Sequence, residues 1–205
     1  MADDSSDSLP VSASALDSAA AAIRRGECVV YPTETVYGLG ADAVDSAAVE
    51  RVFAVKGRSR DKPVSLAVDA VDALDDYVRL SERERAFAEA FLPGPVTLVA
   101  ERREGVPDVL TAGRDRVGVR VPDHPVALAL LDRVETAVTA TSANRSGTGS
   151  ARTVDELAAS IHEACLVLDA GETPGGGSTV VDVAAETVHR RGEDADAVER
   201  WLAEH

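Results

Sequence analysis

The chain is organised around one nine-residue stretch, Val55-Lys56-Gly57-Arg58-Ser59-Arg60-Asp61-Lys62-Pro63. Lys56 and Lys62 are the only two lysines, although the chain contains 21 Lys or Arg and 36 Asp or Glu. Because the chain otherwise uses arginine, two compact ammonium groups beside two arginines predict a site that binds an anion. The alternative is a solvated basic end of the preceding helix, where the helix dipole stabilises cations.

Hydrophobic patterning predicts short strands and helices on both sides of this stretch. Helices are expected over residues 12–25, 45–56, 81–92, 125–131, 153–164 and 195–203. Strands are expected over residues 28–31, 64–68, 96–100, 117–121, 136–140, 166–168, 179–183 and 187–190. Ser81 with Glu84, and Thr153 with Glu156, predict capping boxes at two helix starts. Since several neighbouring strands lack an intervening helix, the sheet should be mixed rather than purely parallel.

The segment Gly38-Leu39-Gly40-Ala41-Asp42-Ala43 fits the loose GxGxxA pattern of dinucleotide-binding proteins. The preceding Thr33-Glu34-Thr35 is polar, and no helix opens directly at the glycines. A dinucleotide site is therefore not expected here.

The charge balance limits the possible partners. A net charge of −15 and a pI near 4.6 argue against general affinity for nucleic acid or anionic membranes. Acidic residues in excess, with arginine in place of lysine, are typical of a halophilic organism whose cytoplasm screens the repulsion. The alternative is an acidic protein from a GC-rich genome.

Length and composition predict one domain over residues 11–205, preceded by a disordered acidic tail over residues 1–10. The tail has no apolar segment typical of a signal peptide, and no apolar run approaches a membrane span. Cys28 and Cys165 are far apart in the sequence and lie in apolar runs, which suits reduced, buried thiols. We expect a cytoplasmic protein.

Three polar loops follow apolar strands, at residues 32–35, 141–147 and 175–179. Hydroxyls, amides and free backbone N–H groups at strand ends can line a crevice for polar ligands or phosphate, although each loop alone is also an ordinary turn. The four histidines show no metal-ligand spacing with one another or with the cysteines, so no metal site is expected. No general base stands out among the abundant carboxylates.

Six segments in order resemble the YrdC-like family of threonylcarbamoyl-AMP synthases. They are Tyr31–Gly40, Lys56–Arg58, Pro93–Leu98, Val117–Pro122, Ser142–Asn144 and Ser178–Asp182. The resemblance implies an α/β fold, with a twisted mixed parallel and antiparallel sheet and flanking helices around a large basic cavity. It implies an enzyme that converts threonine, bicarbonate and ATP into threonylcarbamoyl-AMP and pyrophosphate, with Mg²⁺ accompanying ATP. A tRNA threonylcarbamoyl-transferase complex would use the product.

The resemblance also implies roles for individual residues. Those expected to contact ATP are Arg58, Lys62, Arg116, Ser142, Asn144, Ser150 and Arg190. Those expected around threonine are Thr35, Arg120, Ala140 and Ser178. Lys56, Arg58 and Ser142 would form the catalytic group that holds bicarbonate or the carbamate made from it. Crowding these negative charges requires a cationic, preorganised pocket, which is the kind of site that the lysine and arginine cluster predicts.

The chain departs from the family pattern at Ser59, where proline is common, and at Ala67, where some members have a histidine that contacts threonine. The run Thr148–Ala151 differs from the usual Pro-Ser-Pro and weakens the assignment of Ser150. The chain is expected to be the single-domain form. Two other readings stay open, a non-catalytic RNA-binding relative and a carbamoyl-adenylate enzyme that uses another amine donor. The acidic exterior and scarce aromatic residues argue against the first.

Overall fold

The structure is a computed structural model that describes residues 9–205. The expected acidic tail therefore lies outside the described residues, apart from Leu9 and Pro10. Leu9 packs, partly buried, against the core cluster formed with the first helix. Within the described residues no helix is long and apolar enough to cross a membrane.

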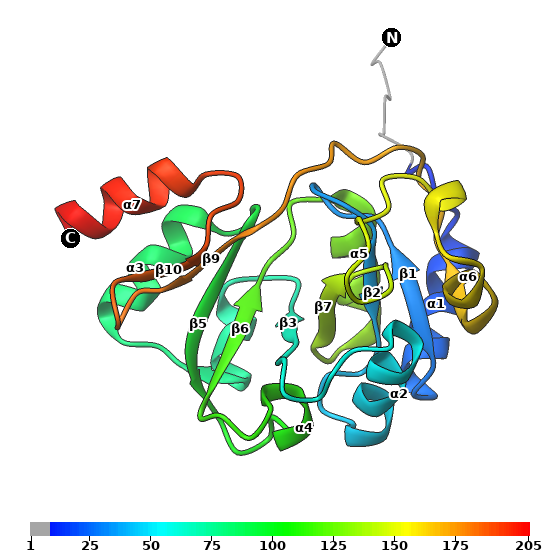
Figure 1. Ribbon diagram of the computed structural model, residues 1–205, viewed down its shortest axis with the longest axis horizontal. Helices are drawn as coiled ribbons and strands as arrows, with labels where there is room; N and C mark the ends of the chain where they lie inside the picture. Colours follow the sequence, from blue (N-terminus) through cyan, green and yellow to red (C-terminus); the bar gives the residue numbers. More distant parts are fainter. Residues whose placement is uncertain (1–8) are drawn as a thin grey trace, which may run out of the picture.

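Residues 9–205 form one mixed sheet of ten strands in the order β10-β9-β5-β6-β3-β7-β2-β1-β8, with β4 paired to β5 (Figure 1). The strands are β1 (Cys28–Tyr31), β2 (Gly38–Gly40), β3 (Ser65–Ala67), β4 (Val78–Arg79), β5 (Val96–Arg102), β6 (Arg116–Arg120), β7 (Val138–Ser142), β8 (Cys165–Val167), β9 (Thr179–Asp182) and β10 (Thr187–Arg190). The pairs β1–β8, β3–β6 and β5–β9 are parallel, and the other pairs are antiparallel. The expected mixed sheet is confirmed.

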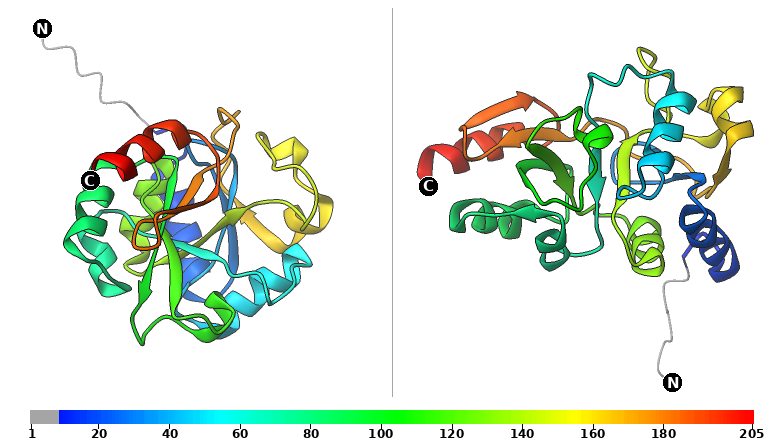
Figure 2. Two further views of the ribbon diagram at one scale, coloured as in Figure 1. Left: turned by 60° about the vertical axis from the view of Figure 1, so that its left-hand side comes forward. Right: turned by 90° about the horizontal axis from the view of Figure 1, so that it is seen from below.

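The helices are α1 (Ala13–Arg24), α2 (Ser46–Lys56), α3 (Glu82–Phe91), α4 (Asp108–Thr111), α5 (Pro125–Val134), α6 (Ala159–Ala164) and α7 (Ala195–Glu204), with 3-10 turns at Asp72–Asp76 and Val154–Glu156. Helices α1 and α5 pack with Val29 on one face of β1, whereas α2 and α6 pack with Val30 on the other. Helices α3 and α7 lie at the opposite end of the molecule, beside β5, β9 and β10 (Figures 1 and 2).

Helix α2 delivers the basic stretch to the sheet. The Asp45 carboxylate accepts a hydrogen bond from the Ala47 N–H at 2.8 Å and caps the start of the helix. Gly57 ends the helix with a left-handed backbone, φ 58°, which glycine adopts without strain. The chain then turns away from the helix axis, so Arg58 leaves the helix and reaches the face of the sheet.

One expected capping box is confirmed and the other is wrong. The Ser81 side chain accepts from the Glu84 N–H, while the Glu84 carboxylate accepts from the Ser81 N–H at 2.9 Å. Thr153 makes no such bond; Glu156 instead accepts from the Arg152 N–H at 2.7 Å. Leu157 is extended and buried against α2 and α6, so the expected helix divides into a 3-10 turn and the short α6.

Strand β2 was not expected from the sequence, because its glycines have no apolar side chains to alternate. A Cβ at Gly40 would lie 2.5 Å from Val138 Cγ1, and one at Gly38 would lie 3.0 Å from the Tyr31 ring. The first distance is shorter than real Cβ contacts and the second is tighter than most of them, so the glycines allow neighbouring strands to pack closely. Their spacing therefore has a packing explanation and needs no dinucleotide.

Cys28 and Cys165 are in-register neighbours on the parallel strands β1 and β8. Both are free thiols; Cys28 is buried and Cys165 is half-buried. The burial expected for Cys28 is confirmed, that expected for Cys165 is only partial, and the reduced state of the two thiols stays a prediction.

Candidate active site

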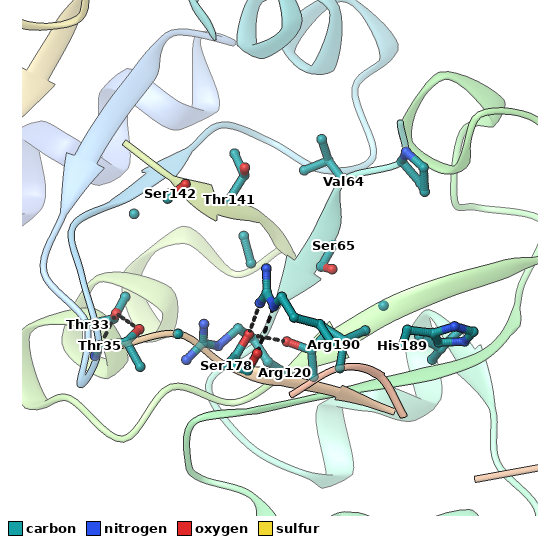
Figure 3. Close-up of a pocket in the computed structure, with 18 of the residues that line it drawn as sticks. Thr33, Thr35, Val64, Ser65, Arg120, Thr141, Ser142, Ser178, His189 and Arg190 are labelled. Carbon is teal, nitrogen blue, oxygen red and sulfur yellow. Dashed lines mark hydrogen bonds between the residues drawn. The ribbon is translucent and has the colours of Figure 1, made fainter. Parts of the chain in front are cut away.

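A cavity of about 830 Å³ is lined by side chains of β5, β6, β7 and β9 and by the loops that follow β1 and α2. Alternation along the strands builds its wall: Val117 and Val119 of β6 face the core, whereas Arg116, Gly118 and Arg120 line the cavity. Loops from both halves of the chain complete it. The lining residues used below are Tyr31, Thr33, Thr35, Arg58, Ser65, Thr97, Arg116, Gly118, Arg120, Ala140, Thr141, Ser142, Ser150, Ser178, Asp182, His189 and Arg190 (Figure 3).

Arg190 and Ser178 lie together in the middle of the cavity wall (Figure 3). Arg190 Nη2 donates to Ser178 Oγ at 2.6 Å, and Arg190 Nε donates to the Ser178 carbonyl at 2.9 Å. Ser178 Oγ also lies 3.1 Å from Thr97 Oγ1. Burial, followed by the charges of Arg120 and Arg58, lowers the pKa of Arg190. The guanidinium groups of Arg58, Arg120 and Arg190 are therefore close enough to create a common positive electrostatic potential, which favours anionic ligands.

Arg58 is held by the loop that follows α2. Its Nε donates to the Lys62 carbonyl at 3.0 Å and its Nη2 donates to the Pro63 carbonyl at 2.9 Å. Burial lowers its pKa, an effect that Asp61 opposes. Because carbonyl oxygens orient the guanidinium without neutralising it, Arg58 presents a full positive charge to the cavity.

Arg120 has a different kind of partner. It forms a salt bridge with Glu34, and both side chains are almost fully enclosed. Beside this pair, Thr33 Oγ1 and Thr35 Oγ1 lie 3.0 Å apart and line the cavity. The loop after β1 thus supplies two hydroxyls to the cavity and one carboxylate to Arg120.

Lys56 lies behind Ser142 and is only 2% exposed. Its Nζ donates to the backbone carbonyls of Ser142 and, at 2.8 Å, of Asn144. Burial, with a smaller contribution from the charge of Arg58, lowers the pKa of Lys56 to about 8. Ser142 Oγ in turn donates to Asn144 Oδ1. The ammonium therefore holds the loop that carries Ser142.

Arg116 is neutralised by acidic neighbours. Its Nη2 donates to Asp182 Oδ1 at 2.9 Å and to the Val99 carbonyl at 2.7 Å, and it lies 3.3 Å from Glu84 Oε1. Glu84 and Asp182 are both buried. Arg116 lines the cavity, but its two carboxylate partners leave it less charge for a ligand than Arg58 or Arg190 has.

The structure brings most of the sequence-predicted residues together. The cavity is lined by Thr35, Arg58, Arg116, Arg120, Ala140, Ser142, Ser150, Ser178 and Arg190. Lys56, Lys62 and Asn144 do not line it. The roles expected of all these residues toward bicarbonate, ATP and threonine stay predictions. Ser150 reaches the cavity despite its altered surroundings. Ala67 is buried in β3, in register with Arg120, and Ser59 is not part of the cavity wall.

Sequence reasoning missed several lining residues, among them Ser65, Thr97, Asp182 and His189. Thr97 and Asp182 lie within two of the six family-like segments, and alternation along those strands would have pointed to them. Ser65 and His189 carry no comparable signal. Within residues 9–205 no group of three or more His, Cys, Asp or Glu side chains is placed to hold a metal ion.

A protein-family model described as "Telomere recombination", Sua5_yciO_yrdC, matches residues 21–192. A threonylcarbamoyl-AMP synthase of Pyrococcus abyssi is 42% identical over 168 residues, which cover 80% of this chain and 49% of that protein. The human threonylcarbamoyl-AMP synthase is 38% identical over 176 residues, which cover 82% of this chain and 63% of that protein. The chain thus spans between about half and two thirds of the length of these relatives.

Solved structures share the fold. The crystal structure of P. abyssi Sua5 complexed with L-threonine superposes with a TM-score of 0.81 at 38% identity, covering 89% of this chain and 56% of that one. E. coli YciO superposes with a TM-score of 0.77 at 25% identity, covering 87% of this chain and 89% of that one.

Proposed function

Since the chain belongs to the Sua5/YciO/YrdC family, we propose that it makes threonylcarbamoyl-AMP and pyrophosphate from threonine, bicarbonate and ATP. The observation that carries the proposal is the set of three guanidinium groups, Arg58, Arg120 and Arg190, in one cavity of about 830 Å³. The reaction joins a carboxylate, a carbamate and a triphosphate, and only a cationic, preorganised pocket can hold these charges together.

The side chains divide into two regions. Arg58 and Arg190 carry full positive charge, and with Ser142 and Ser150 they would bind the phosphates and the bicarbonate-derived carboxylate. Arg120, Thr35, Ala140 and Ser178 would surround threonine, with the guanidinium on its carboxylate. Threonine bound in P. abyssi Sua5, a structure with the same fold, supports placing an amino acid in this cavity. Lys56 would act at the Ser142 side, where bicarbonate is expected.

The chemistry then needs two bond-forming steps. The threonine amine, once deprotonated, attacks the bicarbonate carbon, and loss of hydroxide as water leaves a carbamate. A carbamate oxygen attacks the α-phosphorus of ATP in line, and pyrophosphate leaves. Positioning and charge neutralisation supply the catalysis.

Mg²⁺ would enter with ATP, as part of the substrate. Asp182, a carboxylate that lines the cavity, already accepts hydrogen bonds from Arg116 and from the Ala185 N–H. The lining residues therefore fit an ion that keeps its waters and binds through phosphate oxygens better than one held by a protein cage. Its contribution when bound is to neutralise charge on the leaving pyrophosphate.

The test is an omission experiment. Threonine, ¹³C-bicarbonate and ATP together, but no pair of them, should yield pyrophosphate and a labelled threonylcarbamoyl-AMP mass. A mixture of amino acids should give the threonine product first; a different carbamoyl-adenylate would assign the chain to another amine donor. Tight RNA binding at high salt without any adenylate would instead indicate a binding protein. We further propose that a tRNA threonylcarbamoyl-transferase complex accepts the product in the cytoplasm.

A further inference from the structure

Glu34 and Arg120 form a buried pair whose hydrogen bonding is incomplete. The side chains are 12% and 11% exposed, and Glu34 Oε1 accepts from Arg120 Nη2. Glu34 Oε2 and Arg120 Nε are also buried, and neither has a hydrogen-bond partner among the described residues. Because unsatisfied buried polar atoms reduce stability, a pair with one unused acceptor and one unused donor is poorly explained by stability alone.

Only one of the two side chains lines the cavity. Arg120 lines it, and so do Thr33 and Thr35 on either side of Glu34, but Glu34 itself does not. Glu34 therefore contacts the guanidinium from behind the cavity wall. Because the guanidinium is planar and is tethered through Cδ, a hydrogen bond at Nη2 restricts the directions of its other N–H groups.

This partner distinguishes Arg120 from the other two arginines. Among the described residues, the hydrogen bonds of Arg58 and Arg190 go to carbonyl and hydroxyl oxygens, so neither charge is balanced by a hydrogen-bonded carboxylate. The charge of Arg120 is largely balanced by the Glu34 carboxylate. A triphosphate should prefer the two unbalanced guanidiniums, whereas a singly charged carboxylate can still form directional hydrogen bonds with a balanced one.

We propose that Glu34 is a positioning residue that holds Arg120 in the orientation that binds the carboxylate of the amino-acid substrate. This inference rests on the proposed function, in which Arg120 binds that carboxylate. Glu34 acts through Arg120 and does not touch the substrate. It also keeps Arg120 from turning toward the phosphate region near Arg190 and Arg58.

The first test is Glu34→Gln, which keeps the shape and one acceptor but removes the charge. The KM for threonine should rise about tenfold, the advantage of a charge-assisted hydrogen bond over a neutral one. The KM for ATP and the turnover at saturating threonine should stay close to wild type. The KM for the amino alcohol that corresponds to threonine without its carboxylate should not change. Glu50→Gln, which disrupts an exposed Glu–Arg pair with Arg60, is the matched control and should leave all values unchanged.

The second test is a double-mutant cycle that does not need turnover. Threonine alone should raise the melting temperature of the wild type, and Glu34→Gln and Arg120→Ala should each reduce that shift. The double variant should be no worse than Arg120→Ala, because Glu34 acts only through Arg120. Additive losses, an equal rise in the KM for ATP, or a lower KM for threonine would overturn the proposal. A wild type that shows the cycle but makes no adenylate would refute the proposed function and leave the positioning role standing.

Discussion

Lys56 Nζ lies 2.8 Å from the carbonyl oxygen of Asn144, and the same ammonium also donates to the carbonyl of Ser142. Lys56 is buried, and within residues 9–205 its ammonium pairs with carbonyl oxygens and with no carboxylate. Such a charge is costly without an anion nearby. The predicted bicarbonate beside Ser142 would supply one.

Lys56→Ala should lower turnover by about 10²-fold or more and raise the KM for bicarbonate, because it removes charge stabilisation that the transition state needs. Lys56→Arg should also lower turnover, since the larger, planar guanidinium does not fit where one compact ammonium contacts two carbonyl oxygens. Steady-state kinetics with varied bicarbonate checks both.

The control for this prediction is Arg60→Ala. Arg60 pairs with Glu50 on the surface, where its side chain is 70% exposed, so the effect should be small. If Lys56→Ala lost turnover with a normal KM for bicarbonate, Lys56 would only support the Ser142 loop. If Lys56→Arg were fully active and Arg60→Ala were not, the basic stretch would be a general phosphate-attracting patch.

Lys56 should also make stability depend on pH. Its pKa in the folded state is about 8, below the ordinary value of about 10.4. Between these values the unfolded chain binds a proton that the folded chain does not, so the free energy of unfolding should fall as the pH decreases from about 10 to about 8. The total loss is roughly 3 kcal/mol at 1.36 kcal/mol per pKa unit. Chemical denaturation across this range should show a smaller slope for Lys56→Met than for wild type; equal slopes would contradict the lowered pKa.

Gly40→Ala should destabilise the protein by about 1–3 kcal/mol, because the new methyl group would collide with Val138 and Tyr31 in a close-packed interior. Gly105→Ala is the control, since a Cβ there meets nothing within 4 Å. Denaturant titration of both variants measures the difference. Equal stability of the two would show that the contact of β2 with its neighbours is looser than the structure indicates.

Molar KCl should raise the melting temperature. With 36 acidic against 21 basic side chains, the compact state repels itself at low ionic strength, and salt screens that repulsion. Thermal unfolding at low and molar KCl checks this. An unchanged melting temperature would remove the halophilic interpretation.

Local patterns predicted the elements that depend on local physics. Apolar runs and helix capping depend on neighbours within a few residues. For this reason the sequence predicted the strands over 28–31 and 187–190 and the capping box of Ser81. The box at Thr153 was wrong, since tertiary burial of Leu157 overrides its local signal. The sequence did not predict β2, because its two glycines show no alternation of polar and apolar side chains and do not indicate which strand β2 pairs with.

The candidate site was predicted by resemblance more than by pattern. Four lining arginines, Arg58, Arg116, Arg120 and Arg190, were named in advance and Arg114 was not. The direction of each side chain depends on folded contacts. Nothing local shows that Lys56 faces two carbonyls, or that Glu34 meets Arg120 across 86 residues of chain. Pairings of that kind become visible only when the sheet brings distant segments together.

The residues that line the cavity run from Tyr31 to Arg190 along the sequence, so a fragment that omits either end of this range lacks part of the site. Ligand binding is therefore coupled to folding of the whole domain, and a partly unfolded chain should bind the proposed substrate ATP more weakly. Conversely, ATP at a hundred times its dissociation constant would add about 2.7 kcal/mol to the free energy of unfolding. ATP binding would then stabilise the folded chain, and removing ATP would raise the unfolded fraction that a protease can cut.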